Sequence, residues 1–225
     1  MIGAVSGKTV RPEPWNGRPY AQAMDSREGD LSLRDGEGWL LPLEVMRWTG
    51  LPDVGDETVL ARCEGGVLDI GCGAGRLVEA LARRGSEVLG IDVCTSAVIS
   101  TVCRGGPARS GSVFDPLPAE GGWGTALLID GNIGIGGDPG LLLRRIGDLV
   151  RDGGLLIVEV SATEVDERRR VRLYAGQRAV SPVFSWAAVG PSALERLARE
   201  SGWSATERWT GPRDERHFVA LRARA

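Results

Sequence analysis

The 225-residue sequence predicts an α/β fold, in which a mostly parallel sheet is covered by helices on both faces. Three observations lead to this prediction. Short apolar runs alternate with amphipathic segments between residues 67 and 160, a glycine-rich turn joins the first run to the first segment, and the end of the chain adds one more helix and two strands. With 42% hydrophobic and 25% charged residues, the chain is typical of one globular domain.

The expected elements follow one another at short intervals. The strands are predicted at residues 67–70, 87–91, 108–113, 125–130 and 154–160, and the helices between them at 74–84, 95–104 and 139–150. A helix over 191–201 then precedes strands near 203–209 and 217–223, which we expect to pair as an antiparallel hairpin.

Two regions lie outside this alternation. Residues 1–37 lack hydrophobic periodicity and are expected to form a mobile segment before a single domain at 38–225. Within that domain, residues 38–63 are expected to be two helices that cover the sheet edge. Residues 161–190 are expected to form a hairpin or irregular flap. Because this segment follows a parallel strand, it leaves from the carboxyl edge of the sheet, where ligands bind in open α/β folds, and is a candidate lid.

The most informative stretch is VLDIGCGAGR at residues 67–76. Its three alternate glycines are Gly71, Gly73 and Gly75. Glycine allows a ligand to approach the backbone closely, and the helix that follows favours an anionic group at its N-terminus. Asp69, before the glycines, would repel a pyrophosphate but would pair with an ammonium group. Asp92 ends the next strand and can accept hydrogen bonds from both ribose hydroxyls. The predicted ligand therefore carries an ammonium group and a nucleoside.

An alternative is a NAD(P)-dependent oxidoreductase, whose loop has the pattern G-x-G-x-x-G. Here Arg76 and Leu77 follow Gly75, so the final glycine of that pattern is missing.

With these residues, the chain resembles class I S-adenosylmethionine-dependent methyltransferases. The resemblance implies a doubly wound, seven-stranded sheet of order 3-2-1-4-5-7-6 whose last strand is antiparallel, with S-adenosylmethionine as the cofactor. It implies that Asp69 holds the methionine ammonium group and that the three glycines line the cofactor, with Cys72 as a small residue among them. Asp92, followed by Val93, would contact the ribose.

The same resemblance places the adenine beside GSVFDPLP at residues 111–118. Ser112 and Val113 would lie at the edge of the ring, and Phe114 would offer a stacking face.

Catalytic residues are expected at the carboxyl end of the fourth strand. Asp130 is a candidate to contact the cofactor and to orient the acceptor or accept its proton, and Asn132 lies beside it. The alternative is that both satisfy backbone groups in a long glycine-rich turn. His217, the only histidine, is a candidate base; otherwise it is a half-buried or surface residue that opens a strand.

The acceptor site is expected near three tryptophans in the predicted cover and lid, Trp39, Trp48 and Trp186. Flat apolar walls suit an aromatic acceptor, although each tryptophan can equally be a core residue.

Polar residues are also predicted at the rim. Glu159 is expected either at the rim or as an anchor for a loop, and Arg213 and Asp214 are expected near the rim. The ERRR run at 167–170 either faces an anionic acceptor or is solvated.

Composition excludes several classes. A net charge of −3 without a basic arm disfavours nucleic acid, and no apolar run approaches the length that spans a bilayer. Four cysteines without a C-x-x-C pair predict reduced thiols and no metal site. We therefore expect a cytoplasmic enzyme that methylates a small organic acceptor at O, N or C, in a setting such as secondary metabolism. A protein acceptor, a non-catalytic cofactor-binding partner protein and any oligomeric state stay open.

Overall fold

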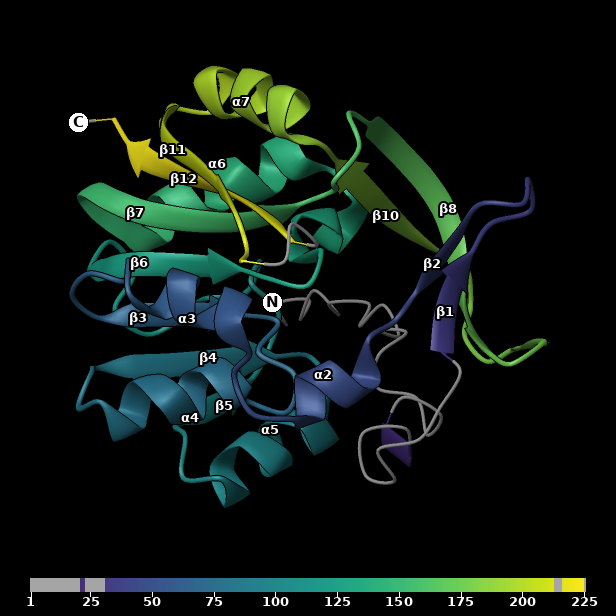
Figure 1. Ribbon diagram of the computed structural model, residues 1–225, viewed down its shortest axis with the longest axis horizontal. Helices are drawn as coiled ribbons and strands as arrows, with labels where there is room; N and C mark the ends of the chain where they lie inside the picture. The colour runs from purple at the N-terminus through teal and green to yellow at the C-terminus, as the bar shows by residue number, and fades with distance from the viewer. Residues whose placement is uncertain (1–20, 23–30, 213–215, 225) are drawn as a thin grey trace, which may run out of the picture.

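The structure is a computed structural model that describes residues 21–22, 31–212 and 216–224 (Figure 1). Its main sheet has seven strands in the order β11-β12-β7-β6-β3-β4-β5. These strands are β3 (Val67–Ile70), β4 (Val88–Asp92), β5 (Ala108–Ser110), β6 (Trp123–Leu128), β7 (Val150–Val160), β11 (Trp203–Thr210) and β12 (His217–Ala223). β12 runs antiparallel to both of its neighbours, and the remaining pairs are parallel. The implied order 3-2-1-4-5-7-6 is confirmed.

Helices cover both faces of this sheet, as the resemblance implies. α3 (Val54–Leu60) and α4 (Arg76–Arg83) pack on one face, and α6 (Pro139–Leu149) and α7 (Pro191–Glu200) pack on the other. α5 (Thr95–Cys103) follows β4. All six residues of β6 are buried, which is typical of a parallel strand covered on both sides. No helix in the described part of the chain is long and apolar enough to cross a membrane.

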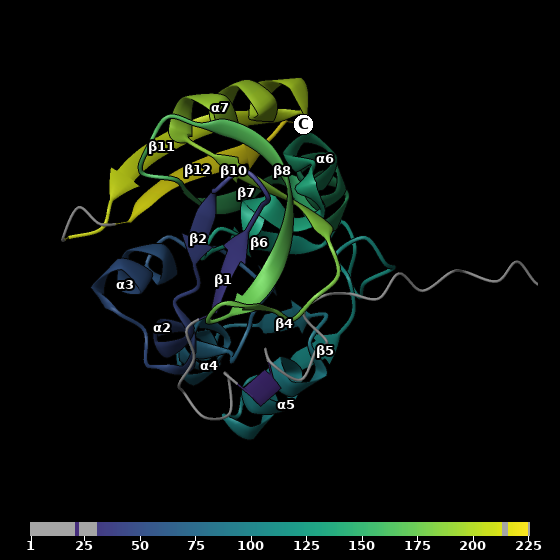
Figure 2. The ribbon, with the colours of Figure 1, turned by 90° about the vertical axis from the view of Figure 1, so that its right-hand side faces the viewer.

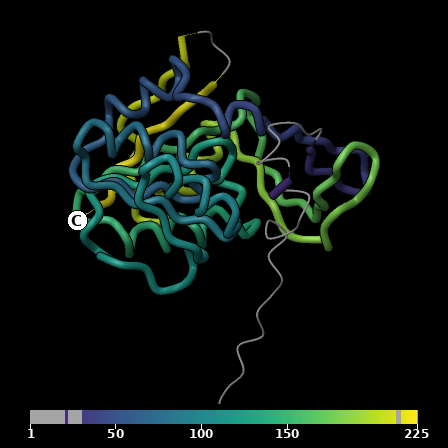
Figure 3. The backbone as a smooth tube through the Cα atoms, turned by 90° about the horizontal axis from the view of Figure 1, so that it is seen from below, coloured from purple at the N-terminus to yellow at the C-terminus, as the bar shows by residue number. Residues whose placement is uncertain are grey.

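A second, antiparallel sheet stands beyond the end of the main sheet toward which β6 points (Figures 1 and 2). Its strand order is β10-β8-β1-β2, and the short β9 pairs with β8. The strands are β1 (Leu31–Arg34), β2 (Leu40–Pro42), β8 (Asp166–Ala175), β9 (Arg178–Ala179) and β10 (Phe184–Val189). In the tube view this sheet forms a separate lobe beside the main body (Figure 3). The hairpin expected within 161–190 is thus present as β8 and β10.

The N-terminal part of this sheet differs from the sequence expectation. Residues 31–34, expected within the mobile segment, form a strand in which Leu31 and Leu33 are buried. The helix expected over 38–48 is replaced by β2 and the short helix α2 (Val45–Thr49). The reason is long-range pairing, because β1 lies between β2 and the distant β8. Pro42 is tolerated because β2 is an edge strand.

The third strand of the main sheet is also shorter than expected. β5 ends at Ser110 rather than at residue 113, because the backbone then turns and Ser112 N donates to Asp115 Oδ2 at 3.2 Å. Residues 1–20 and 23–30 of the expected mobile segment lie outside the described residues.

Candidate active site

The glycine-rich loop joins β3 to α4 and is fixed by contacts with β4 and α5. The amides of Gly71 and Cys72 donate to Ile91 O at 2.8 and 3.0 Å. Gly75 has a φ of 83°, and a Cβ built on it would lie 2.4 Å from Thr101 Oγ1, so no larger residue fits there. A Cβ on Gly73, in contrast, would meet no atom within 4 Å. This part of the loop therefore leaves space for a ligand.

Asp69 lies at the end of β3, where it is 3% exposed. Burial raises its pKa to about 7; nearby carboxylates also raise the pKa, whereas Arg76 opposes the shift. No described residue donates a hydrogen bond to its carboxylate group. Such a group is costly to bury without a partner, and a ligand ammonium would provide both the donors and the charge. This environment fits the role implied for Asp69.

Asp92 lies across the loop from Asp69, at the end of β4. Its Oδ2 accepts from Gly73 N at 2.9 Å and its Oδ1 from Cys94 N at 2.8 Å. Burial raises the pKa of Asp92, and these backbone donors oppose the shift. The carboxylate is thus held against the open part of the loop, where it can receive hydroxyl groups. The half-buried Val93 follows it.

Cys72 fits the interpretation of a small residue within the loop. Burial, together with the charges of Asp69 and Asp92, raises the pKa of its thiol well above the usual value. A protonated, buried thiol is not a nucleophile.

The segment expected beside the adenine forms a turn after β5. Ser112 Oγ accepts from Phe114 N at 3.3 Å, and Val113 is buried, with its carbonyl accepting from Arg145 Nε at 2.9 Å. The Phe114 ring is 39% exposed and lies beside Gly136. The turn therefore presents an aromatic ring next to the loop that follows β6.

Asp130, expected to orient the acceptor or accept its proton, is surrounded by arginines. Arg76 Nη1 and Arg47 Nη2 donate to its carboxylate at 2.7 and 2.6 Å, and Arg216 Nη2 lies 3.8 Å away. Burial alone would raise its pKa, but these guanidinium groups hold it below the usual value. A carboxylate stabilised in this way is a weak proton acceptor, so the environment does not suit a general base.

Asn132 braces the glycine loop. Its Nδ2 donates to Ile70 O at 2.9 Å and to Gly71 O at 3.0 Å. It lies in the short 3-10 helix η2 (Asn132–Gly137), which follows β6. The structure therefore brings Asn132 to the predicted cofactor loop, in a supporting position.

Two other predicted site residues lie close to Asp130 along the strands. Glu159 Oε2 accepts from Asp130 N at 2.8 Å, which is the anchoring role considered for it. His217 opens β12 opposite Val160, and its half-buried side chain makes no hydrogen bond with a described residue. Because the guanidinium of Arg216 lies over the ring of Phe218, alternation along the strand directs His217 to the opposite face.

The three tryptophans share one apolar cluster between the second sheet and the glycine loop. Trp186 is buried in it, and Trp39 and Trp48 are half-buried against it. The cluster also contains Ala74 of the glycine loop. Trp186 lies close to η2, since a Cβ on Gly134 would be 2.5 Å from its Cε2. The second sheet therefore presents an aromatic face to the predicted site.

The ERRR run belongs to β8, where its side chains alternate. Arg169 is half-buried and pairs with Asp35 at 2.7 Å and with Glu167, whereas Arg168 and Arg170 are exposed. Arg213 and Asp214 lie outside the described residues.

The sequence interpretation missed the residues that hold Asp130. These are Arg47, Arg76 and Arg216, together with Asp56, which pairs with Arg76 and Arg216. One signal was available, because Arg76 is a positive charge in the first turn of α4, where the helix dipole disfavours it.

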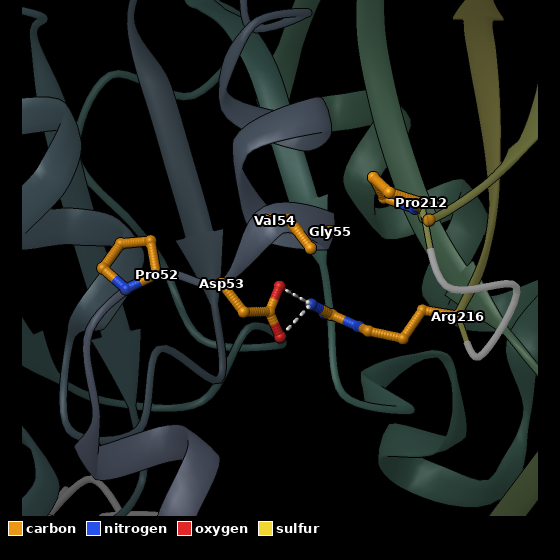
Figure 4. Close-up of a pocket in the computed structure, with 7 residues that line it drawn as sticks. Pro52, Asp53, Val54, Gly55, Pro212 and Arg216 are labelled. Atoms are coloured by element: carbon orange, nitrogen blue, oxygen red, sulfur yellow. Dashed lines mark hydrogen bonds and ion pairs between the residues drawn. The ribbon is translucent and has the colours of Figure 1, made fainter.

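A surface pocket of about 340 Å³ lies beside Arg216, between the start of α3 and the turn from β11 to β12 (Figure 4). It is lined by residues 52–55, 211–212 and Arg216. The ion pair between Asp53 and Arg216 forms its wall, with Nη1 3.0 Å from Oδ1. None of the predicted cofactor residues lines this pocket.

Comparisons with known proteins agree with this arrangement. Residues 57–208 match the family model of the methyltransferase domain. Over 98 residues the chain is 32% identical to a ubiquinone biosynthesis O-methyltransferase from Azorhizobium caulinodans. This match covers 41% of this chain and 38% of that protein. A second such enzyme, from Alkalilimnicola ehrlichii, is 50% identical over 44 residues, 17% of this chain and 18% of its own length. The chain thus matches well under half of the length of these curated relatives.

Among solved structures, a methyltransferase from Bacteroides fragilis in complex with S-adenosyl-L-homocysteine superimposes with a TM-score of 0.74. It shares 21% identity, and the match covers 94% of this chain and 95% of that one, which shows a common fold. The family model matches more than half of the chain, and the sheet order and glycine loop agree with it. The chain therefore belongs to the methyltransferase domain family and has the fold of S-adenosylmethionine-dependent methyltransferases.

Proposed function

We propose that this enzyme methylates a small, planar aromatic acceptor bound between the glycine loop and the second sheet. The observation that carries the proposal is the environment of Asp69, a buried carboxylate to which no described residue donates a hydrogen bond, just before the loop in which Gly73 leaves open space. The aromatic cluster of the second sheet packs against the same loop through Ala74. A cofactor held at the loop would thus face the tryptophans.

Each part of the cofactor has a matching group in the chain. Asp69 would pair with the methionine ammonium, Asp92 with the ribose hydroxyls, and the exposed ring of Phe114 with the adenine. Arg47 adds a partner for the methionine carboxylate. Its Nη2 is held by Asp130 at 2.6 Å, its buried Nε has no hydrogen-bond partner among the described residues, and 25% of the side chain stays exposed.

The bound cofactor supplies an activated methyl group on a positively charged sulfur. Held by Asp69 and Asp92, it would give this methyl group to a lone pair of the acceptor, with S-adenosylhomocysteine as the leaving group. The chain contributes orientation and exclusion of water, and well-oriented reactants can gain about 7–11 kcal/mol in this way. Because Asp130 is a weak base, we assign no side chain of the described residues to proton removal; a proton that the acceptor still carries after the transfer would pass to bulk solvent as the product leaves.

Two kinds of similar protein support an acceptor of this size. The curated relatives are named as ubiquinone biosynthesis O-methyltransferases. A Burkholderia thailandensis N1-methyltransferase holds 1,6-didemethyltoxoflavin and S-adenosylhomocysteine; it is 20% identical, has a TM-score of 0.55, and the match covers 75% of each chain. Since the curated relatives are named for methylation of oxygen and the solved structure for methylation of nitrogen, these names do not indicate which acceptor atom receives the methyl group. The net charge of −3 gives no support to a nucleic-acid partner.

Turnover with defined acceptors tests the proposal. The protein is incubated with S-adenosylmethionine and separate panels of phenols, aromatic amines and aliphatic amines, and S-adenosylhomocysteine is measured by mass spectrometry. We expect release above the acceptor-free rate with aromatic acceptors, and a reduced rate for Trp186→Leu with unchanged cofactor affinity. Cofactor binding without release from any panel would instead favour a non-catalytic binding protein.

A further inference from the structure

Five ionised side chains form a closed ring beside the cofactor loop. Arg76 Nη1 donates to Asp130 at 2.7 Å, while its Nε and Nη2 donate to Asp56 at 2.8 and 3.0 Å. Arg216 Nη1 donates to the same Asp56 at 2.7 Å, and its Nε and Nη2 donate to Glu159 at 2.9 and 2.8 Å. Glu159 closes the ring by accepting from Asp130 N at 2.8 Å.

The ring joins distant parts of the chain in a buried position. Its members come from α3, α4, the end of β6, β7 and the residue before β12. The Asp56 side chain is fully buried, and those of Arg76 and Arg216 are 4% and 8% exposed. Burying ions costs several kcal/mol each, and a well-packed apolar replacement is often as stable. Fold stability alone therefore gives no reason for this arrangement.

The ring holds Asp130 in a backbone conformation that it would not adopt freely. Asp130 has a φ of 58°, in the left-handed region, which is disfavoured for residues other than glycine. Glu159 fixes its amide and Arg76 fixes its carboxylate. Both ends of the residue are thus constrained, which sets the direction of the carboxylate.

That direction determines the position of Arg47. Asp130 Oδ1 accepts a hydrogen bond from Arg47 Nη2. This contact joins the ring to Arg47, which is not a member of the ring. The three acids and two arginines of the ring carry one surplus negative charge, Asp53 adds another through its pair with Arg216, and Arg47 supplies one compensating positive charge. Among the described residues the buried Nε of Arg47 has no hydrogen-bond partner, and 25% of the Arg47 side chain stays exposed, where an anionic group can approach it.

We propose that Arg216 is a positioning residue for the cofactor, which acts through Asp56, Arg76 and Asp130 to place Arg47 against the methionine carboxylate. This inference rests on the proposed function, because it requires the cofactor to lie with its amino-acid end beside Asp69 and Arg47. It assigns a role at the cofactor site to a residue of the C-terminal part of the chain.

Two ligands separate positioning from general support of the fold. S-adenosylhomocysteine carries the amino-acid end, whereas 5′-methylthioadenosine has the same nucleoside and sulfur without it. We expect Arg216→Met to weaken binding of S-adenosylhomocysteine at least about tenfold, as measured by calorimetry, and to leave the affinity for 5′-methylthioadenosine within about twofold. Arg47→Met should behave in the same way.

The double variant tests the connection between the two arginines. If Arg216 acts through Arg47, then Arg47→Met combined with Arg216→Met should bind S-adenosylhomocysteine no more than about twofold more weakly than the worse single variant. Arg222→Met is the matched control, since Arg222 lies on β12 and pairs with Glu64 at the surface. It should leave both affinities unchanged. Arg216→Lys keeps the charge without the paired contact to Glu159, and provides a milder variant if Arg216→Met does not fold.

Three results would overturn the inference. They are a parallel loss of both affinities in folded Arg216→Met, additive effects in the double variant, or wild-type affinity for S-adenosylhomocysteine in Arg216→Met. If the wild-type protein itself fails to bind S-adenosylhomocysteine, the proposed function fails, which is a distinguishable outcome.

Discussion

The side-chain amide of Asn132 donates to the carbonyl oxygen of Gly71 at 3.0 Å, and so joins the loop after β6 to the cofactor loop after β3. The two residues are also close in space, because a Cβ on Gly71 would lie 2.6 Å from Asn132 Nδ2. The loops at the ends of two adjacent parallel strands are therefore held as one unit. A residue expected to face the acceptor instead supports the cofactor loop.

Replacement of Asn132 by alanine tests this support. The change removes two hydrogen bonds, and we expect S-adenosylhomocysteine to bind about 5- to 10-fold more weakly, because a typical bond contributes about 1 kcal/mol. Calorimetry measures the effect. His217→Asn serves as the comparison at another predicted catalytic position and should leave cofactor affinity unchanged. If His217→Asn bound S-adenosylhomocysteine more weakly while Asn132→Ala kept wild-type affinity, the roles assigned to these two residues would be contradicted.

Cofactor affinity should depend on pH through Asp69. Burial raises its pKa to about 7 in the unliganded protein, so it is mostly protonated at pH 6 and mostly ionised at pH 8. Only the ionised form pairs with the ligand ammonium, and we expect the dissociation constant for S-adenosylhomocysteine to fall about tenfold over this interval.

The free protein should respond to pH in the opposite sense. Because the folded pKa of Asp69 lies above the unfolded value, stability is lost as pH rises toward about 7. Asp69→Asn should therefore raise the thermal midpoint more at pH 8 than at pH 5, and its weak cofactor affinity should not vary with pH. A tenfold change that persists in Asp69→Asn would assign the titration to another group.

Two glycines with similar backbone angles separate local strain from loss of space. Gly75 and Gly85 have φ values of 83° and 74°, but only Gly75 is crowded, with Thr101 Oγ1 2.4 Å from a built Cβ. Gly85→Ala should cost about 1 kcal/mol of unfolding free energy and leave ligand binding intact.

Gly75→Ala should cost more stability and weaken S-adenosylhomocysteine at least about tenfold, because α5 or the loop must shift. Denaturant titration and calorimetry on both variants measure these effects. Equal behaviour of the two variants would show that the loop tolerates the displacement.

Asp56 should make the largest single contribution to stability within the buried ring. Although its burial opposes ionisation, Arg76 and Arg216 lower its pKa to about 2. Asp56→Asn leaves two buried guanidinium groups with less compensation, and we expect a loss of about 3–5 kcal/mol at pH 7. Glu57 lies on the same helix as Asp56 and forms an exposed pair with Arg84, which follows α4. Glu57→Gln disrupts this pair and should cost less than about 1 kcal/mol.

The pH dependence of the Asp56 effect follows from the same shift. Its folded pKa lies below the unfolded value, so the stabilisation is complete above about pH 4 and is lost as pH falls toward 2. The difference between wild type and Asp56→Asn, measured by urea unfolding, should be constant from pH 7 to 5 and shrink below 4. A difference that grows on acidification would contradict the assignment.

The main sheet and the cofactor loop could be predicted because their signals are local. Alternating segments specify the parallel sheet, and Asp69 and the glycines lie within ten residues of one another. The second sheet could not be predicted in the same way, since β1 is recognisable as a strand only when β8 lies beside it. The local sequence therefore predicts mobile chain and helix where the structure has its N-terminal strands.

The grouping of arginines around Asp130 could not be predicted from the sequence for a similar reason. Arg47, Arg76 and Arg216 are separated by long stretches of sequence, and an isolated arginine is usually a solvated residue. Only the folded chain brings them to one carboxylate. The position of Asp130 was therefore predictable from the end of its strand, whereas the environment that makes it a weak base was not.

A crystal structure of the wild-type protein with S-adenosylhomocysteine tests the central claim most directly. We predict that the ligand ammonium lies within hydrogen-bond distance of Asp69, that both ribose hydroxyls contact Asp92, and that the sulfur faces the cluster containing Trp186. A ligand bound in another cleft, or with its amino-acid end away from Asp69, would contradict this account of the site.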